Sequence, residues 1–300
     1  MLDISVVILT YNEELHIRRC LENVNFFAFE TFVIDCFSTD KTVEIAKSLG
    51  ATVVQHTWPG NQAEQFNWAL DNLDIRTNWI LRLDADEYVS NELIEELNEK
   101  LPHLSEQVSA VVLPLGRAFL GRVLKHGIVN GIKMIRLFRA GKVRYEIRLM
   151  DEHLKVLEGE IVSFNGKFID DNRDSLKHFI DKHNNYSSRE AALLLDAEYE
   201  ITKVSEYDDS AFCQDVQQKR LQKRRYASYP LFWRAFGYFV YRYFFKLGFL
   251  DGKEGFLWDF LQGWWYRTLV DAKVFEIKKA CGTDKEKIKQ YLKEHYNISL

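Results

Sequence analysis

Trp79-Ile-Leu-Arg-Leu-Asp-Ala-Asp-Glu87 is an apolar run that ends in three carboxylates within four residues. A short apolar run of this kind predicts a buried strand. Carboxylates at the end of a buried strand are electrostatically costly unless a cation lies beside them, because burial disfavours their charged form. We therefore predict a divalent metal at the carboxyl end of a central parallel strand.

Apolar runs alternate with helical patterns along the first hundred residues. Strands are expected over residues 4–9, 32–35, 51–55 and 79–83, and helices over residues 14–24, 41–49, 61–73 and 91–101. Ser90 is the expected N-cap of the last helix, and Gly50 the expected C-cap of the second. Strands that alternate with ten-residue helices predict a parallel sheet with right-handed crossovers.

Polar clusters follow three of these strands, at the point where each strand ends. They are Thr10-Tyr-Asn-Glu13, Asp35 and the acids from Asp84 to Glu87. Ligands of open α/β sheets bind at the carboxyl ends of the strands, so we expect these clusters to form one site. The chain has no Gly-x-Gly-x-x-Gly after the first strand and no Gly-Lys-Ser/Thr loop, which argues against a dinucleotide-binding fold and a phosphate-loop nucleotidase.

Composition narrows the class of protein further. The chain has 300 residues and a net charge of −4, which argues against a general nucleic-acid binder. Its four cysteines lie far apart, as expected for reduced thiols in a cytosolic protein. We expect no signal peptide and no membrane-spanning helix, since no run of 18 residues is uninterruptedly apolar.

The middle of the chain is rich in basic residues. A fifth strand is expected over residues 108–115, antiparallel strands over residues 119–150 and a helix over residues 174–200. We expect the basic side chains of residues 119–150 to face the acidic edge and to serve an anionic substrate. They are Arg122, Lys125, His126, Lys133, Arg136, Arg139, Lys142, Arg144 and Arg148.

The C-terminal third differs in composition from the rest. Of the 42 aromatic residues, 18 fall between Tyr226 and Tyr266, just after five cations in residues 219–225. The pattern predicts helices that lie in a membrane interface, with Arg234, Arg242 and Lys246 toward lipid headgroups. The alternative is a packed helical subdomain or a dimer contact. We expect a catalytic domain over residues 1–205 and a helical extension over residues 206–300.

Three segments together resemble the signatures of glycosyltransferase family 2, whose fold is GT-A. They are Val6-Val-Ile-Leu-Thr-Tyr-Asn-Glu13, Val33-Ile-Asp-Cys-Phe-Ser-Thr-Asp40 and Leu83-Asp-Ala-Asp-Glu87. Segments near residues 150–153, 182–191 and 248–252 resemble bacterial members that build lipopolysaccharide core, capsule or exopolysaccharide. The resemblance implies an α/β fold with a mostly parallel central sheet flanked by helices, followed by an aromatic-rich helical extension.

The family resemblance also implies an activity. It is the metal-dependent, inverting transfer of a hexose from a nucleotide sugar, most readily a UDP-sugar, to a lipid-linked saccharide of a bacterial surface glycan. The enzyme would lie in the cytoplasm as a peripheral protein on the inner membrane, with self-association through the aromatic helices as a further contact. Two rivals remain open: a nucleotidyltransferase, which would need a glycine-rich basic loop after the first strand, and a scaffold that has lost catalysis.

Roles for single residues follow from the same resemblance. Asp86 and His178 would ligate Mg²⁺ or Mn²⁺, hard cations that prefer oxygen ligands. Glu152, or else Asp151, would be the base that deprotonates the acceptor hydroxyl. Side chains implied in binding the base, ribose, diphosphate or donor sugar are Thr10, Asn12, Glu13, Asp35, Asp84 and Arg136. The family commonly has Asp and Gly where this chain has Cys36 and Phe37.

Overall fold

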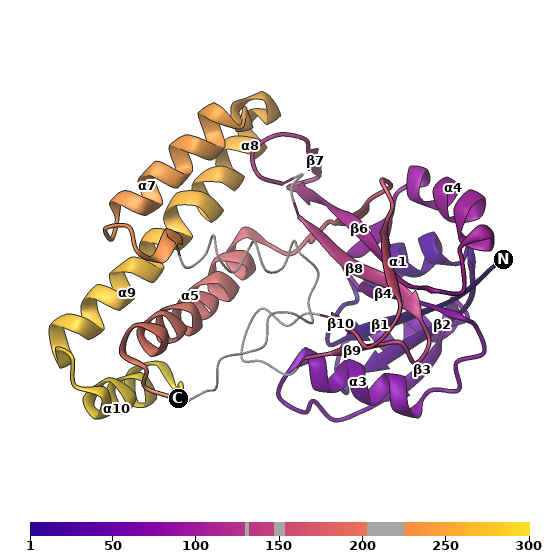
Figure 1. The fold of residues 1–300 in the computed structure, drawn as a ribbon, viewed down its shortest axis with the longest axis horizontal. Helices are drawn as coiled ribbons and strands as arrows, with labels where there is room; N and C mark the ends of the chain where they lie inside the picture. Colours follow the sequence, from indigo (N-terminus) through magenta and orange to yellow (C-terminus); the bar gives the residue numbers. More distant parts are fainter. Residues whose placement is uncertain (130–131, 147–153, 203–224) are drawn as a thin grey trace. The chain divides into compact units, whose positions relative to one another are not determined.

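The computed structural model describes residues 1–129, 132–146, 154–202 and 225–300 (Figure 1). Asp151, Glu152 and Arg148 lie outside these ranges. The chain divides into two compact units, the first made of residues 1–124 and 129–173 and the second of residues 125–128 and 174–300.

The first unit is built on a ten-stranded sheet. Its strands are β1 Leu2–Thr10, β2 Ala28–Asp35, β3 Thr52–Gln55, β4 Trp79–Asp84, β5 Glu87–Val89, β6 Val108–Phe119, β7 Arg122–Leu124, β8 Lys133–Arg139, β11 Glu160–Ser163 and β12 Phe168–Asp170. The order is β3-β2-β1-β4-β8-β6-β12-β5, with β7 and β11 also paired to β6. A small second sheet pairs β9 (Val143–Tyr145) with β10 (Leu154–Val156).

The first four strands pair as the sequence predicts. β1 runs parallel to both β2 and β4, and β2 runs parallel to β3. The next strand in the sheet, β8, is antiparallel to β4 and to β6. One half of the sheet, from β3 to β4, is therefore parallel, and the antiparallel strand β8 joins it to the other half.

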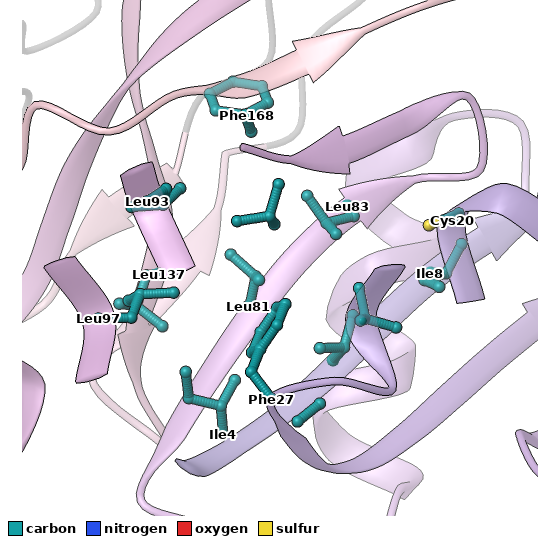
Figure 2. Packing of buried hydrophobic residues seen from close by; sticks show 14 of the residues in the cluster. Ile4, Ile8, Cys20, Phe27, Leu81, Leu83, Leu93, Leu97, Leu137 and Phe168 are labelled. Carbon is teal, nitrogen blue, oxygen red and sulfur yellow. The ribbon is translucent and has the colours of Figure 1, made fainter. Parts of the chain in front are cut away.

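Four helices cover the two faces of this sheet: α1 Ile17–Val24, α2 Thr42–Ser48, α3 Gln62–Asn72 and α4 Asn91–Lys100. Side chains of β1 are buried on both faces of the sheet, because successive strand residues point to opposite faces. Ile4 and Ile8 pack with Leu81 of β4 and Leu97 of α4, on the face that α1 and α2 also cover (Figure 2). The opposite face packs on α3 through Phe66.

Two predicted helix boundaries are confirmed. The Ser90 hydroxyl accepts a hydrogen bond from the backbone N–H of Leu93 at 3.3 Å, as an N-cap does. Gly50 follows α2 at φ +84°, a left-handed conformation that glycine adopts without strain.

The second unit is helical in its described residues. Its α-helices are α5 Leu176–Tyr199, α7 Trp233–Val240, α8 Gly252–Trp258, α9 Tyr266–Cys281 and α10 Lys285–Tyr296. π-helical turns at residues 241–245 and 259–265 extend α7 and α8. A core shared by α5, α9 and α10 contains Leu195, Ile277 and Leu292. The boundary between the two compact units thus lies before α5, whereas the predicted boundary between the catalytic domain and the extension lies at residue 205.

Two arginines of the second unit occupy its interior. Arg234 donates to Asp271 at 2.8 Å, and Arg242 donates to Asp259 at 2.8 Å. All four side chains are buried. The prediction that Arg234 and Arg242 point toward lipid headgroups is therefore wrong, because buried carboxylates on neighbouring helices pair with both guanidinium groups. In the described part of the chain, none of the helices combines the length and apolarity needed to cross a bilayer.

Candidate functional site at the carboxyl edge of the sheet

The register of the first strands brings the predicted polar clusters together. Thr10 pairs with Asp35 across β1 and β2, and Leu9 pairs with Asp84 across β1 and β4. The clusters that follow three strands therefore lie at one edge of the sheet, as predicted.

Asp35 is fully buried and accepts four hydrogen bonds. Its donors are the Thr10 hydroxyl at 3.2 Å, the Ser38 backbone N–H at 2.9 Å, the Ser38 hydroxyl and the Gln55 amide at 3.4 Å. A carboxylate has about four acceptor positions, so these bonds satisfy it. The predicted bond from a base N–H to Asp35 requires one of these donors to move.

Asn12 and Phe37 shape the loops at this edge through unusual backbone conformations. Asn12 has φ 55° and its side chain accepts a bond from the Thr39 backbone N–H at 2.8 Å. Phe37 has φ 60°, which is uncommon for a bulky residue, and its ring is 53% exposed. The glycine that the family commonly has at this position would relieve that backbone strain.

Asp84 lies between two buried arginines. Arg82 Nη2 donates to Asp84 Oδ1 at 2.8 Å, and Arg136 Nη2 lies 3.3 Å from Asp84 Oδ2. Arg136 also donates to Glu87 at 2.7 Å. Within the described residues, Arg136 Nε and Nη1 have no hydrogen-bond partner although both are buried. Arg136 thus belongs to the acidic edge, as predicted, and holds two of its carboxylates.

Glu87 has a role that the sequence did not indicate. Its side chain is buried, and it accepts from the Asp84 backbone N–H at 2.9 Å as well as from Arg136. Burial raises the pKa of Glu87 to about 8, and the neighbouring Arg136 opposes that shift. The ion pair with Arg136 favours the charged form of Glu87, whereas burial favours its neutral form.

Asp86 lies among other acids at this edge. Burial raises its pKa to about 6, and the charges of Asp170 and Asp84 add to the shift. The Asn172 amide donates to Asp86 Oδ2 at 3.1 Å, and this hydrogen bond lowers the pKa. A carboxylate that is desolvated among like charges is a favourable ligand for a cation.

The segment from Asp170 to Arg173 completes the site, and sequence reasoning missed it. It begins at the last residue of β12, where Asp170 pairs with Glu87 of β5. The Asp171 backbone N–H donates to the Asp86 carbonyl at 3.0 Å. A signal was present, since the run Phe168-Ile-Asp-Asp171 repeats the apolar-to-acidic pattern of residues 79–87.

The predicted metal site at Asp86, the metal-ligand role of His178 and the predicted catalytic base remain predictions. Among the described residues, no group of three His, Cys, Asp or Glu side chains is placed to hold a metal ion. His178 belongs to the second unit, where its Nε2 lies 3.5 Å from Asp174. Asp151 and Glu152 lie outside the described residues.

The predicted basic surface is not a single surface. Lys142 pairs with Glu158, Arg144 pairs with Asp71, and Arg139 donates to the Val108 carbonyl at 2.8 Å. Arg139 pairs with Trp79, at the amino end of β4, because β8 runs antiparallel to β4. The expectation that the whole run faces the acidic edge is therefore wrong for these three residues.

Comparison with known proteins finds a family match over the first part of the chain. The model of the family "Glycosyl transferase family 2" matches residues 5–153. A glycosyltransferase of Rickettsia typhi is 28% identical over 266 residues, which cover 86% of this chain and 82% of the relative. One of Rickettsia bellii is 43% identical over 94 residues, so the match spans only 31% of that relative's length.

Solved structures give a more limited likeness. Glucosyl-3-phosphoglycerate synthase from Mycobacterium tuberculosis, in complex with Mn²⁺, UDP and glucosyl-3-phosphoglycerate, is 24% identical with a TM-score of 0.31. The alignment covers 38% of this chain and 44% of the synthase. The matched family segment contains β1, β2 and β4 with the polar clusters that end them. The chain thus has an α/β fold and belongs to glycosyltransferase family 2.

Proposed function

We propose that this protein is a metal-dependent, inverting glycosyltransferase that moves a hexose from a UDP-sugar to a lipid-linked saccharide. One observation carries the proposal: the carboxyl ends of β1, β2 and β4 bring Thr10, Asp35 and Asp84 together by strand register. The same edge carries Asp86, and the family model matches this segment.

The donor's nucleoside is proposed to bind at the β1 and β2 loops. Asn12 Oδ1 and the Ser38 hydroxyl already tie these loops together, which orders the backbone there. Exposed Tyr11 and Phe37 rings, 58% and 53% accessible, flank the same loops and offer faces on which a base can stack. Thr10 and Glu13 line this end in the proposal.

The metal is proposed to bind at Asp86. The site fits a hard divalent cation, since the Asp86 carboxylate is buried and lies near the negative charges of Asp170 and Asp84. When bound, Mg²⁺ or Mn²⁺ would neutralise charge on the departing nucleoside diphosphate. Arg136, with buried N–H groups beside Asp84, holds the carboxylates of this edge in place.

The acceptor hydroxyl needs a base, and we favour Glu152 over Asp151. Removing the carboxylate of a general base is expected to lower turnover at least about a hundredfold. The comparison of Glu152→Gln with Asp151→Asn decides the assignment. Near-wild-type turnover in Glu152→Gln, with loss in Asp151→Asn, would move the base one residue back.

The direct test of the activity is a panel of nucleotide sugars. Binding and slow hydrolysis are measured with UDP-, GDP- and dTDP-linked hexoses, with Mn²⁺, with Mg²⁺ and with EDTA. We expect a UDP-hexose to bind and to lose its sugar only with metal. Binding of no nucleotide sugar would overturn the proposal, and release of pyrophosphate from a nucleoside triphosphate and a sugar phosphate would favour the nucleotidyltransferase alternative.

Membrane attachment of the second unit is a further part of the proposal. Residues 241–250 join α7 to α8, and six of their large apolar side chains are between 43% and 73% exposed. They are Tyr241, Phe244, Phe245, Leu247, Phe249 and Leu250. Clustered exposed rings of this kind mark a membrane or protein contact. Lys246, exposed among them, is placed to meet an anionic headgroup.

Flotation with anionic liposomes tests this attachment. We expect the wild-type protein to float, and Phe244→Ser/Phe245→Ser to bind at least about tenfold more weakly, because two rings leave the lipid. Phe26→Ser, which removes an 81% exposed ring from the first unit, is the control. Equal flotation of all three proteins would sink the membrane claim. A dimer in light scattering that the double variant loses would favour the dimer contact instead.

A further inference from the structure

His16 joins two loops of the site, although the proposed function gives it no role. It is the residue before α1, and its side chain is only 1% exposed. Its Nδ1 lies 2.7 Å from Glu13 Oε2, and its Nε2 accepts a hydrogen bond from the backbone N–H of Arg173 at 2.9 Å. One imidazole therefore contacts the loop after β1 and the segment after β12.

The two hydrogen bonds define which nitrogen carries the proton. Nε2 accepts from a backbone N–H, so the neutral ring has its proton on Nδ1 and donates it to the Glu13 carboxylate. Both ring nitrogens are used, and the ring is buried. These facts leave His16 no free group to touch a substrate.

Arg19, one turn further along α1, holds the same segment at a second point. Its Nη2 donates to the Asp171 carbonyl at 2.8 Å and to the Asp86 carbonyl at 3.0 Å, and its Nη1 pairs with Asp171. The start of α1 thus fixes the segment after β12 through two side chains.

The segment held in this way contacts the carboxylate to which we assign the metal. Asn172 donates to Asp86 Oδ2 at 3.1 Å, and the Asp171 backbone N–H donates to the Asp86 carbonyl. Movement of Arg173 by loss of the His16 bond would displace its neighbour Asn172. Groups that orient a ligand in this way are known to change metal affinity strongly.

We propose that His16 is a positioning residue that couples the nucleotide end of the site to its metal end. Through Nδ1 it orients Glu13, and through Nε2 it holds Asn172 against Asp86. The inference rests on the proposed function for its nucleotide and metal readouts, but the hydrogen-bonded link itself does not depend on that function.

Two substitutions separate the two ring nitrogens. In His16→Asn the amide N–H takes the place of Nδ1, so the bond to Glu13 is kept and the bond to Arg173 is lost. In His16→Gln the amide oxygen takes the place of Nε2, so the bond to Arg173 is kept and the bond to Glu13 is lost. His103→Asn, an exposed histidine in the same unit, is the control.

The full-length variants are titrated with Mn²⁺ in saturating UDP, and with UDP in saturating Mn²⁺. We expect His16→Asn to weaken Mn²⁺ binding about tenfold. We expect His16→Gln to weaken UDP binding about threefold or more and to keep Mn²⁺ affinity. In a cycle with Asn172→Ala, the Mn²⁺ losses should not add, since both changes act on the same contact. Unchanged Mn²⁺ affinity in His16→Asn, or equal losses in both variants, would overturn the coupling.

Hydrogen exchange distinguishes failure of this inference from failure of the proposed function. If the wild-type protein binds neither UDP nor Mn²⁺, the donor and metal assignments are wrong. The link is then judged by the Arg173 amide, which should be protected in the wild type and in His16→Gln and exchange faster in His16→Asn. Equal exchange in all three proteins would refute the link.

Discussion

Replacing Asp86 by Asn is expected to lower the rate of sugar transfer about 10³-fold, a loss of roughly 4 kcal/mol in transition-state stabilisation. The change removes the charge of the proposed metal ligand and little else. The amide oxygen of the new residue can still accept the Asn172 hydrogen bond that Asp86 accepts at 3.1 Å. The measurement is kcat/KM with the donor that the nucleotide-sugar panel selects, in Mn²⁺.

Asp3→Asn is the matched control for this variant. Asp3 is also an acid of the parallel strands, but it lies at the end of β1 away from the site and accepts a hydrogen bond from Asn78. We expect its transfer rate to stay near that of the wild type. Full activity of Asp86→Asn with divalent metal present would show that the metal assignment is wrong.

The raised pKa of Asp86 gives this prediction a pH dependence. Its carboxyl titrates near pH 6, chiefly because it is buried and then because Asp170 lies near it. Below that pH a metal ion must displace a proton, so Mn²⁺ affinity should fall about tenfold per pH unit. The folded-state pKa is above the ordinary value, so this group's contribution to stability is lost as the pH rises through 6. Asp86→Asn should therefore unfold at higher denaturant than the wild type at pH 7.5, as calorimetry or urea titration can check.

Replacing Arg136 by Met is expected to lower the free energy of unfolding by about 3–5 kcal/mol. Arg136 is 4% exposed and its partner Glu87 is 3% exposed. Without Arg136, Glu87 stays buried and loses the ion pair that opposes the rise of its pKa, so it must either take up a proton or keep an uncompensated charge. Urea unfolding followed by tryptophan fluorescence measures the change.

A double variant and a surface control test whether the loss of stability comes from the buried ion pair. Arg136→Met/Glu87→Gln removes the unpaired charge, so it should recover much of the loss. Lys142→Met breaks the more exposed pair with Glu158 and should cost less than about 1 kcal/mol. A loss below 1 kcal/mol in Arg136→Met would mean that water reaches Glu87 and that the pair does not organise the edge.

The sequence predicted the parts of this protein that depend on local patterns. Apolar runs with acids at their ends located β1, β2 and β4, and alternation with helices predicted their parallel pairing. Caps such as Ser90 and Gly50 were found because their chemistry acts over a few residues. Parallel pairing then placed Thr10, Asp35 and Asp84 at one edge, which is why three separate clusters pointed to one site.

Only the tertiary structure decided which charged groups meet. Arg136 lies 52 residues from Asp84, and Asn172 lies 86 residues from Asp86. These contacts depend on the antiparallel return of β8 and on the position of β12, which no local period encodes. For the same reason the sequence could not show that Arg139 and Arg144 lie away from the acidic edge, or that Arg234 and Arg242 are buried. The acidic cluster at the end of residues 79–87 could thus be predicted from the sequence. Its contacts with Arg136 and Asn172, and the hydrogen bonds of His16, could not, because side-chain pairing across a sheet depends on strand register and not on composition.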